Sequence, residues 1–260
     1  MIKQKLKIVK IGGNVINNKE ALSLFLADFS QIKEAKILVH GGGKKATEMA
    51  NDLGLQPKMI EGRRITDTAN LEIVTMVYAG LLNKNITAQL QEKKCNALGL
   101  SGADANTILA HKRIVKDIDY GFAGDVDIVD SKMINVFLEN GITPVFCAIT
   151  HDGKGQLLNT NADTIASEIG SAMAGIYDVE LIYCFEKSGV LSDIEDETTL
   201  IQNIDLNRYQ ILKEQNIIVE GMIPKMDNCF DALQKGVAKV IIGKSDVINN
   251  KELEHTTLVL

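Results

Sequence analysis

Short apolar runs that alternate with longer amphipathic stretches constrain the fold of this chain more than any other feature. The apolar runs are typical of strands buried on both faces of a parallel sheet. The stretches between them space apolar residues three to four apart, as helices with one buried stripe do. Strands are predicted at 6–11, 36–40, 96–100, 142–149, 179–185 and 237–242. Helices are predicted at 19–33, 44–53, 68–93, 131–138, 162–174 and 225–234.

This βα repeat predicts an α/β fold, a three-layer αβα sandwich around a mainly parallel sheet. Residues 59–66 and 107–129 interrupt the repeat and are predicted to form short hairpins above the sheet. No linker rich in Pro, Gly or Ser divides the 260 residues, so we expect one compact, bilobal domain. The longest unbroken apolar run has five residues, far short of a membrane-spanning helix, which excludes a membrane protein of that kind.

Composition narrows the classes of partner. The net charge of −6, the 5% aromatic content and the absence of Trp argue against a nucleic-acid-binding protein. Four separated cysteines form no C-x-x-C pair and lie at no metal-ligand spacing, which predicts buried thiols and no metal site. The N-terminus lacks the apolar segment of a secretion signal. Together these features favour a reduced, cytoplasmic protein whose partners are small molecules.

Ligands of such a sheet bind beyond the carboxyl ends of its strands. The first strand ends at Lys10 and is followed by Gly12 and Gly13, for which we predict positive φ and outward amides that accept an anion. Lys10 itself is either functional or a lysine whose stem lies along the surface. Gly41–Gly43 follow His40 and precede a helix start. That arrangement favours binding of a phosphate or carboxylate over a merely flexible turn.

Other polar residues cluster where the next elements begin. Arg63 and Arg64 form either a guanidinium pair for a carboxylate ligand or a solvated loop pair. Asn159, Asn161 and Asp163 precede or open a helix, and N-capping accounts for only one of them. Lys225 lies at another helix start. The helix dipole disfavours a cation there, so we expect a negative group nearby, either Asp163 or a bound phosphate.

Three familiar alternatives lack their context. The glycine pattern through Gly41 and Gly43 has no acidic strand end about 20 residues later, so a dinucleotide site is disfavoured. Gly243-Lys244-Ser245 lacks the earlier glycine of a phosphate-binding loop. The histidines form no Ser/His/Asp or Cys/His arrangement, and His40 is expected to be a buried, hydrogen-bonded side chain.

Taken together, the motifs at 10–13, 40–43, 62–66, 158–163 and 221–225 resemble those of the N-acetylglutamate kinases of the amino acid kinase family. The resemblance covers nearly the whole chain in order. It implies transfer of the γ-phosphoryl group of ATP, with Mg²⁺, to the side-chain carboxylate of an N-acylated glutamate, the second step of arginine biosynthesis. A carboxylate is already ionised at pH 7, which agrees with the lack of a poised histidine.

The resemblance also implies roles for individual residues. Lys10 and Lys225 would stabilise charge on the transferred group, and Asp163 would hold both ammonium groups. Residues 1–175 would bind the acylglutamate and residues 176–260 the ATP. The implied substrate contacts are Gly42, Gly43, Arg64 and Asn159, with Asn161 nearby. The implied nucleotide contacts are Gly12, Gly13, Glu186, Gly189, Leu191 and Ile218.

The chain departs from the family pattern at two places. Residues 185–189 differ from the usual nucleotide segment, so contacts to adenosine are expected to differ there. Arg63 stands where relatives often have an apolar residue, and we hypothesise that it binds an extra charge on the acyl group, as in N-succinylglutamate.

Other readings concern assembly and function. Arginine-inhibited relatives have an extra helix before the first strand; nine residues precede Lys10, so we expect a homodimer without arginine feedback. Alternative functions are a carbamate or glutamate kinase and a non-catalytic nucleotide sensor. The weakest alternative is a dinucleotide oxidoreductase.

Overall fold

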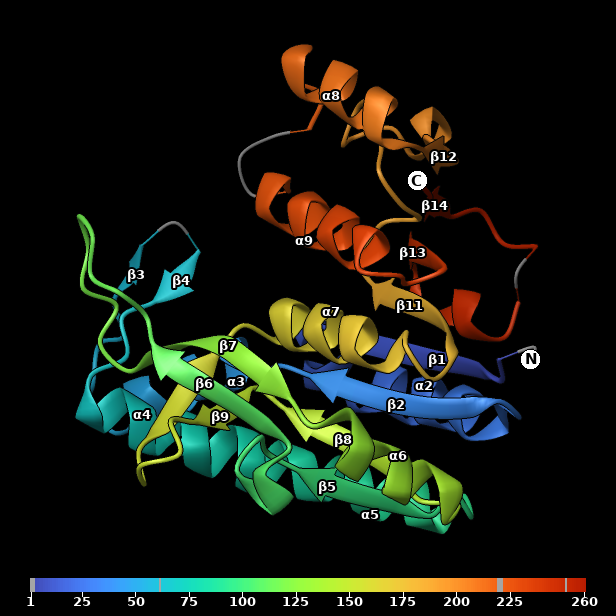
Figure 1. Ribbon diagram of the computed structural model, residues 1–260. Coiled ribbons are helices and arrows are strands. Elements are labelled where there is room, and N and C mark those ends of the chain that lie inside the picture. The colour runs from blue at the N-terminus through green and yellow to red at the C-terminus, as the bar shows by residue number, and fades with distance from the viewer. Residues whose placement is uncertain (1–2, 61, 219–221, 251) are drawn as a thin grey trace.

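The computed structural model describes residues 3–60, 62–218, 222–250 and 252–260. Its centre is an eight-stranded sheet with the order β12-β14-β13-β11-β1-β2-β8-β5 (Figure 1). From β13 to β5 all neighbouring strands are parallel, whereas β14 runs antiparallel to β13. The strands are β1 (Lys5–Ile11), β2 (Ala35–His40), β5 (Ala97–Leu100), β8 (Thr143–Cys147), β11 (Asp178–Cys184), β12 (Asn203–Ile204), β13 (Lys239–Gly243) and β14 (Thr256–Leu258).

Helices cover both faces of this sheet, which confirms the predicted three-layer α/β sandwich (Figure 1). One face carries α6 (Ser131–Glu139), α7 (Ala162–Met173) and α9 (Ile223–Gln234). The other carries α1 (Gly13–Asn17), α2 (Lys19–Gln31), α3 (Gly43–Asp52) and α5 (Asn83–Glu92), while α8 (Leu206–Glu214) lies near β12. Six of the seven residues of β1 are buried, as expected for a strand covered on both sides.

A second, smaller sheet lies beyond the central one and closes on itself in the order β10-β7-β6-β9. It contains the predicted hairpin of β6 (Ile108–Lys112) and β7 (Ala123–Val129), together with β9 (Ile149–His151) and β10 (Leu157–Thr160). The single strand predicted at 142–149 is therefore wrong at its end. The chain leaves the central sheet after β8, and β9 pairs antiparallel with β10, because both segments are apolar enough to serve either sheet.

The long helical stretch predicted at 68–93 is confirmed, but it is not uniform. It consists of α4 (Thr68–Thr75), a π-helical segment (Met76–Leu82) and α5, which follow one another without a break. The predicted hairpin at 59–66 is also present as β3 (Met59–Ile60) and β4 (Arg63–Arg64). Among the described residues, no helix has both the length and the apolar content to cross a membrane.

Candidate active site

The first feature of the site is a buried ion pair at the carboxyl end of the central sheet. Lys10 is the next-to-last residue of β1, and its Nζ lies 2.6 Å from Oδ1 of Asp163. Asp163 is in the first turn of α7, where the Asn161 side chain caps the helix by accepting hydrogen bonds from the amides of Asp163 and Thr164. Strand and helix thus bring two charges together that are distant in the chain, and each neutralises the other out of water.

A second lysine approaches the same place. Lys225 lies in the first turn of α9, and its Nζ is 4.5 Å from the centre of the Phe185 ring. Lys10 Nζ is 5.9 Å from the same ring centre, so two ammonium groups share one aromatic side chain. Asp163 forms its ion pair with Lys10; within the described part of the chain it forms none with Lys225. The predicted bridge from Asp163 to both lysines is therefore absent, because the ammonium group of Lys225 lies over the ring.

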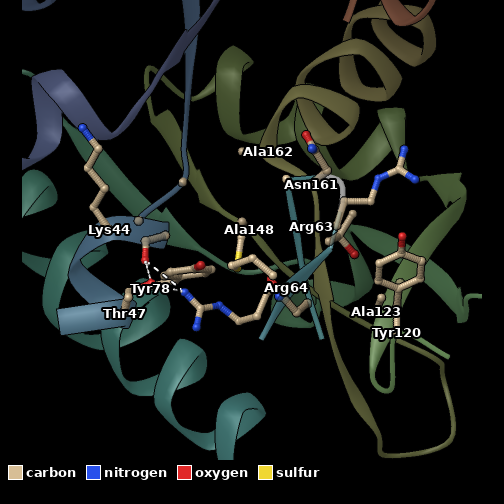
Figure 2. A pocket seen from close by; sticks show the side chains of 18 of the residues that line it. Lys44, Thr47, Arg63, Arg64, Tyr78, Tyr120, Ala123, Ala148, Asn161 and Ala162 are labelled. Atoms are coloured by element: carbon tan, nitrogen blue, oxygen red, sulfur yellow. Dashed lines mark hydrogen bonds between the residues drawn. The ribbon is translucent and has the colours of Figure 1, made fainter. Parts of the chain in front are cut away.

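A cavity of about 600 Å³ lies between α3, the β3–β4 hairpin and the small sheet (Figure 2). The six residues predicted to bind the acceptor substrate all line it: Gly42, Gly43, Arg63, Arg64, Asn159 and Asn161. Asn159 also donates a hydrogen bond from Nδ2 to Thr66 Oγ1 at 3.0 Å. The cavity wall includes Ala162, the neighbour of Asp163, so it reaches the end of α7 that carries the buried ion pair.

Arg64 is the most firmly held cation of this cavity. It is 7% exposed, and its Nη2 donates to Gly43 O at 3.1 Å and to Thr47 Oγ1 at 2.6 Å, while Nη1 donates to Asn70 Oδ1 at 3.4 Å. Burial raises the pKa of Tyr78, and the nearby Arg64 guanidinium partly offsets that rise. Since every partner of Arg64 is uncharged, its positive charge remains available to an anionic ligand.

A second cavity, of about 630 Å³, lies in the C-terminal part of the chain. It is lined by the predicted nucleotide residues Glu186, Gly189, Leu191 and Ile218, together with Phe185 and Lys225. The row Asp163, Lys10, Phe185, Lys225 therefore leads from the edge of the first cavity to the wall of the second. Such an arrangement can bind two anionic molecules and place cations where they meet.

Comparison with known proteins agrees with this geometry. The family model described as amino acid kinase family matches residues 5–244. The chain belongs to the amino acid kinase family. It is 53% identical to the acetylglutamate kinase of Cytophaga hutchinsonii, over 98% of this chain and 99% of that one. It is 51% identical to the acetylglutamate kinase of Phocaeicola vulgatus, over 95% and 96% of the two chains.

Solved structures show the same fold at lower identity. The N-acetylglutamate synthase of Neisseria gonorrhoeae, solved with coenzyme A and N-acetylglutamate, superposes with a TM-score of 0.82 at 21% identity. That likeness covers 100% of this amino acid kinase and 60% of the synthase chain.

The glycines after β1 differ from their prediction. Gly12 has φ −99° and Gly13 begins α1, so neither has the positive φ expected of an anion-binding nest. Neither glycine lines the two cavities. A Cβ at Gly12 would lie 3.8 Å from Lys10 Nζ, which places this backbone beside the ammonium group. In this amino acid kinase, α1 starts directly after the strand, and a turn with left-handed residues is not needed.

The three glycines after β2 serve close packing. A Cβ at Gly42 would lie 2.5 Å from Leu82 Cδ1 and 2.7 Å from Tyr78 Cδ1. Both side chains come from the π-helical segment, so that segment lies against the backbone at the start of α3. The N-terminus of α3 consequently faces the first cavity with no side chain in front of its amides, which suits an anion.

His40 and the cysteines have the structural roles predicted for them. His40 is fully buried; its Nδ1–H donates to Gly41 O at 2.8 Å, and Nε2 accepts from Asn83 Nδ2 at 3.1 Å. Burial lowers the pKa of His40 to about 4, so the ring is neutral at pH 7. The four cysteines are buried and free, and burial raises the pKa of Cys147 and of Cys184 to about 12.

Several residues of the first cavity were not predicted. Thr47 and Tyr78 flank Arg64, while Arg113 and Tyr120 come from the β6–β7 hairpin (Figure 2). Arg113 makes a two-point ion pair with Asp125, with contacts of 2.5–3.1 Å. Helical spacing could have placed Thr47 and Tyr78 on inward faces, but the position of the hairpin depends on contacts between distant segments.

Proposed function

We propose that this amino acid kinase transfers the γ-phosphoryl group of ATP to the side-chain carboxylate of N-acetylglutamate, giving an acyl phosphate. The observation that carries the proposal is the position of Lys10, Asp163 and Lys225 between two cavities. Relatives named acetylglutamate kinase at about half identity over nearly the full chain support the same acceptor. The product would then belong to the second step of arginine biosynthesis.

The chemistry needs charge stabilisation more than proton transfer. The acceptor carboxylate is ionised at pH 7, so no general base is required. The difficulty is to bring an anion onto a triphosphate, and two ammonium groups at the meeting point reduce that repulsion. Lys10 is proposed to contact the transferred group from the β1 side and Lys225 from the α9 side. Asp163 keeps the Lys10 ammonium charged and fixed.

The acceptor is proposed to bind in the first cavity. Arg64 and the α3 N-terminus offer a fixed cation and free amides to a carboxylate, and Asn159 offers an amide to a polar group. The nucleotide is proposed to bind in the second cavity, against Glu186, Gly189, Leu191 and Ile218. Residues 1–175 would then serve the acceptor and residues 176–260 the ATP, as the sequence predicts.

Magnesium is proposed to enter with the triphosphate. Mg²⁺ in kinases is commonly held by phosphate oxygens, water and one or two carboxylates. Asp163 is the carboxylate at the meeting point of the two cavities, and Lys10 already occupies its Oδ1 side. The fit is therefore to a nucleotide-borne ion. When bound, that ion would neutralise phosphate charge.

A second acyl group, succinyl, is favoured by the wall of the first cavity. Arg63, Arg113 and Tyr120 line this cavity and also an adjoining recess of about 370 Å³, to which Lys116 contributes. Asp125 neutralises Arg113, whereas Arg63 is exposed. A longer acyl chain that ends in a carboxylate would reach these cations, while an acetyl group would not. We propose N-succinylglutamate as the second candidate on this ground.

The decisive experiment traps the acyl phosphate itself. Hydroxylamine converts an acyl phosphate to a hydroxamate, so incubation with ATP and each acceptor reports the product directly. N-acetylglutamate should give hydroxamate, and N-succinylglutamate should be compared beside it. Free glutamate and carbamate should give no ATP-dependent phosphorylation. Phosphorylation of free glutamate or carbamate alone, or nucleotide binding without turnover, would replace the proposal by one of the alternatives. A homodimer and a cytoplasmic location stay predictions.

A further inference from the structure

Phe185 is the aromatic residue at the centre of the site, and the sheet fixes its position. It follows directly after β11, and its amide donates to Gly243 O at 2.7 Å. Its ring stacks on Tyr183, with ring centres 6.3 Å apart and planes 10° apart. The Tyr183 hydroxyl donates to Asp163 O at 3.0 Å. The ring is thereby connected to the same helix turn that carries the buried carboxylate.

The two lysines depend on this ring to different degrees. Lys10 has the Asp163 carboxylate at 2.6 Å and lies at the outer limit of a cation–π contact with Phe185. Lys225 Nζ is closer to the ring, at 4.5 Å. Within the described ranges, no carboxylate forms an ion pair with Lys225, so the ring face is the attractive partner that the structure gives its ammonium group.

We propose that Phe185 is a positioning residue that holds the Lys225 ammonium group beside the Lys10–Asp163 pair. The inference rests on the proposed function, since the place of Lys225 matters there for the charge on the transferred phosphoryl group. Two free ammonium groups repel each other, and the negative face of an aromatic ring attracts both without neutralising either. A carboxylate in this place would neutralise Lys225 and repel the triphosphate. An aromatic ring orients the lysine and leaves its charge for the nucleotide.

The side chain can be changed with little change in shape. Phe185→Leu keeps an apolar group but removes the ring face, and Phe185→Tyr keeps the ring. We expect Phe185→Leu to lower kcat about three- to thirtyfold, the span of known cation–π contributions, and to leave the KM of the acylglutamate within about twofold. Phe185→Tyr should restore kcat to within about twofold of wild type. A wild-type kcat in Phe185→Leu would overturn the proposal, as would an equally low kcat in Phe185→Tyr.

A fluorination series separates this role from packing. Phenylalanines with one, two and three ring fluorines at position 185 have nearly the same shape but a progressively weaker ring face. We expect log kcat to fall with each added fluorine while the thermal midpoint of unfolding stays nearly constant. The same kcat across the series would show that the ring acts through packing alone. The series also covers the case in which Phe185→Leu fails to fold.

A last readout needs no acceptor and therefore separates the two proposals. Trace acetylation followed by mass spectrometry measures the reactivity of Lys225 relative to exposed Lys154. We expect Phe185→Leu to raise the relative reactivity of Lys225 about threefold or more, because the ring favours the ammonium form over the reactive amine. Unchanged reactivity defeats the role of Phe185 even in an active kinase. If wild type phosphorylates no acylglutamate, the proposed function fails and the labelling still tests the ring.

Discussion

Lys10 Nζ and Asp163 Oδ1 lie 2.6 Å apart, with only 10% and 9% of the two side chains exposed. Each charge is therefore tolerated in the interior because the other is present. The pair has a structural role as well as its proposed catalytic one. The two roles can be separated by variants that remove one partner, both partners, or the other lysine.

The first prediction concerns the stability of the buried pair. Asp163→Asn leaves the Lys10 ammonium buried without a counter-charge and should lower the free energy of unfolding by about 3–5 kcal/mol. Adding Lys10→Met should recover part of that loss, because no unpaired charge then remains. Urea unfolding of both single variants and the double variant gives the coupling. The exposed pair Lys45–Glu48 is the control; its removal should cost less than about 1 kcal/mol. Additive effects at the buried pair would contradict the prediction.

The second prediction compares the two lysines. Lys10→Met and Lys225→Met should each lower kcat about 10²- to 10³-fold, the usual effect of removing a preorganised charge-stabilising donor. Only Lys10→Met should also lower the free energy of unfolding strongly, because it leaves Asp163 buried and unpaired. Hydroxamate trapping and urea unfolding measure the two effects. A near-normal kcat in Lys225→Met would place that lysine outside the reaction.

The third prediction concerns the close contact at Gly42. A methyl group there would lie 2.5 Å from Leu82 Cδ1, so Gly42→Ala forces the π-helical segment away from α3. We expect a loss of about 1–3 kcal/mol in unfolding free energy and a raised KM for the acylglutamate. Gly80→Ala is the matched control, because a Cβ at Gly80 meets nothing within 4 Å. It should leave KM unchanged and stabilise the helix by up to about 1 kcal/mol.

The fourth prediction concerns pH and His40. Burial lowers the pKa of His40 to about 4, below its ordinary value of 6.5, so the unfolded state binds a proton more readily than the folded state. Stability is therefore complete above pH 6.5 and falls as the pH drops toward 4. At pH 5 the loss from this residue should be about 2 kcal/mol.

Urea unfolding at pH 7.5 and pH 5 measures the effect of His40, and His40→Gln is the comparison. Glutamine keeps an acceptor for Asn83 and does not titrate, so the drop between the two pH values should be smaller by that amount. An equal drop in both proteins would show that other groups cause it.

The fifth prediction concerns the acyl group. If Arg63 binds a terminal carboxylate, Arg63→Ala should raise the KM for N-succinylglutamate about tenfold, equivalent to roughly one charged hydrogen bond. The KM for N-acetylglutamate should change less than twofold. Arg208→Ala, an exposed residue of α8, controls for loss of a surface charge. A clear preference of wild type for the acetyl substrate, unaffected by Arg63→Ala, would end the succinyl hypothesis.

The sequence predicted the central strands and helices because their signals are local. Apolar runs marked β1, β2 and β11, and the regular spacing from Thr68 onward marked the long helix. The short strands β12 and β14 were not predicted, since two or three residues carry no period. α8 was also missed; it has few buried residues and hence no clear apolar stripe.

The candidate site was predicted in its membership more than in its geometry. Strand ends and helix starts located Lys10, Asp163 and Lys225 correctly at one edge, because parallel strands end together. That Phe185 would separate the lysines could not be predicted, since it depends on how β11 and α9 approach each other. The conformation of Gly12 was wrong because a glycine pair has no fixed φ until its neighbours are placed.

The π-helical segment Met76–Leu82 has a consequence for the long helix as a whole. A π-turn holds one residue more than an α-turn, so shortening the segment by one residue would turn everything after it by about 100°. Ile86 and Leu90, now fully buried, would rotate toward solvent, and Tyr78 would lose its place under Gly42. A single lost codon in this stretch would thus disturb both the hydrophobic interior and the acceptor cavity, whereas most surface loops of the protein could absorb one.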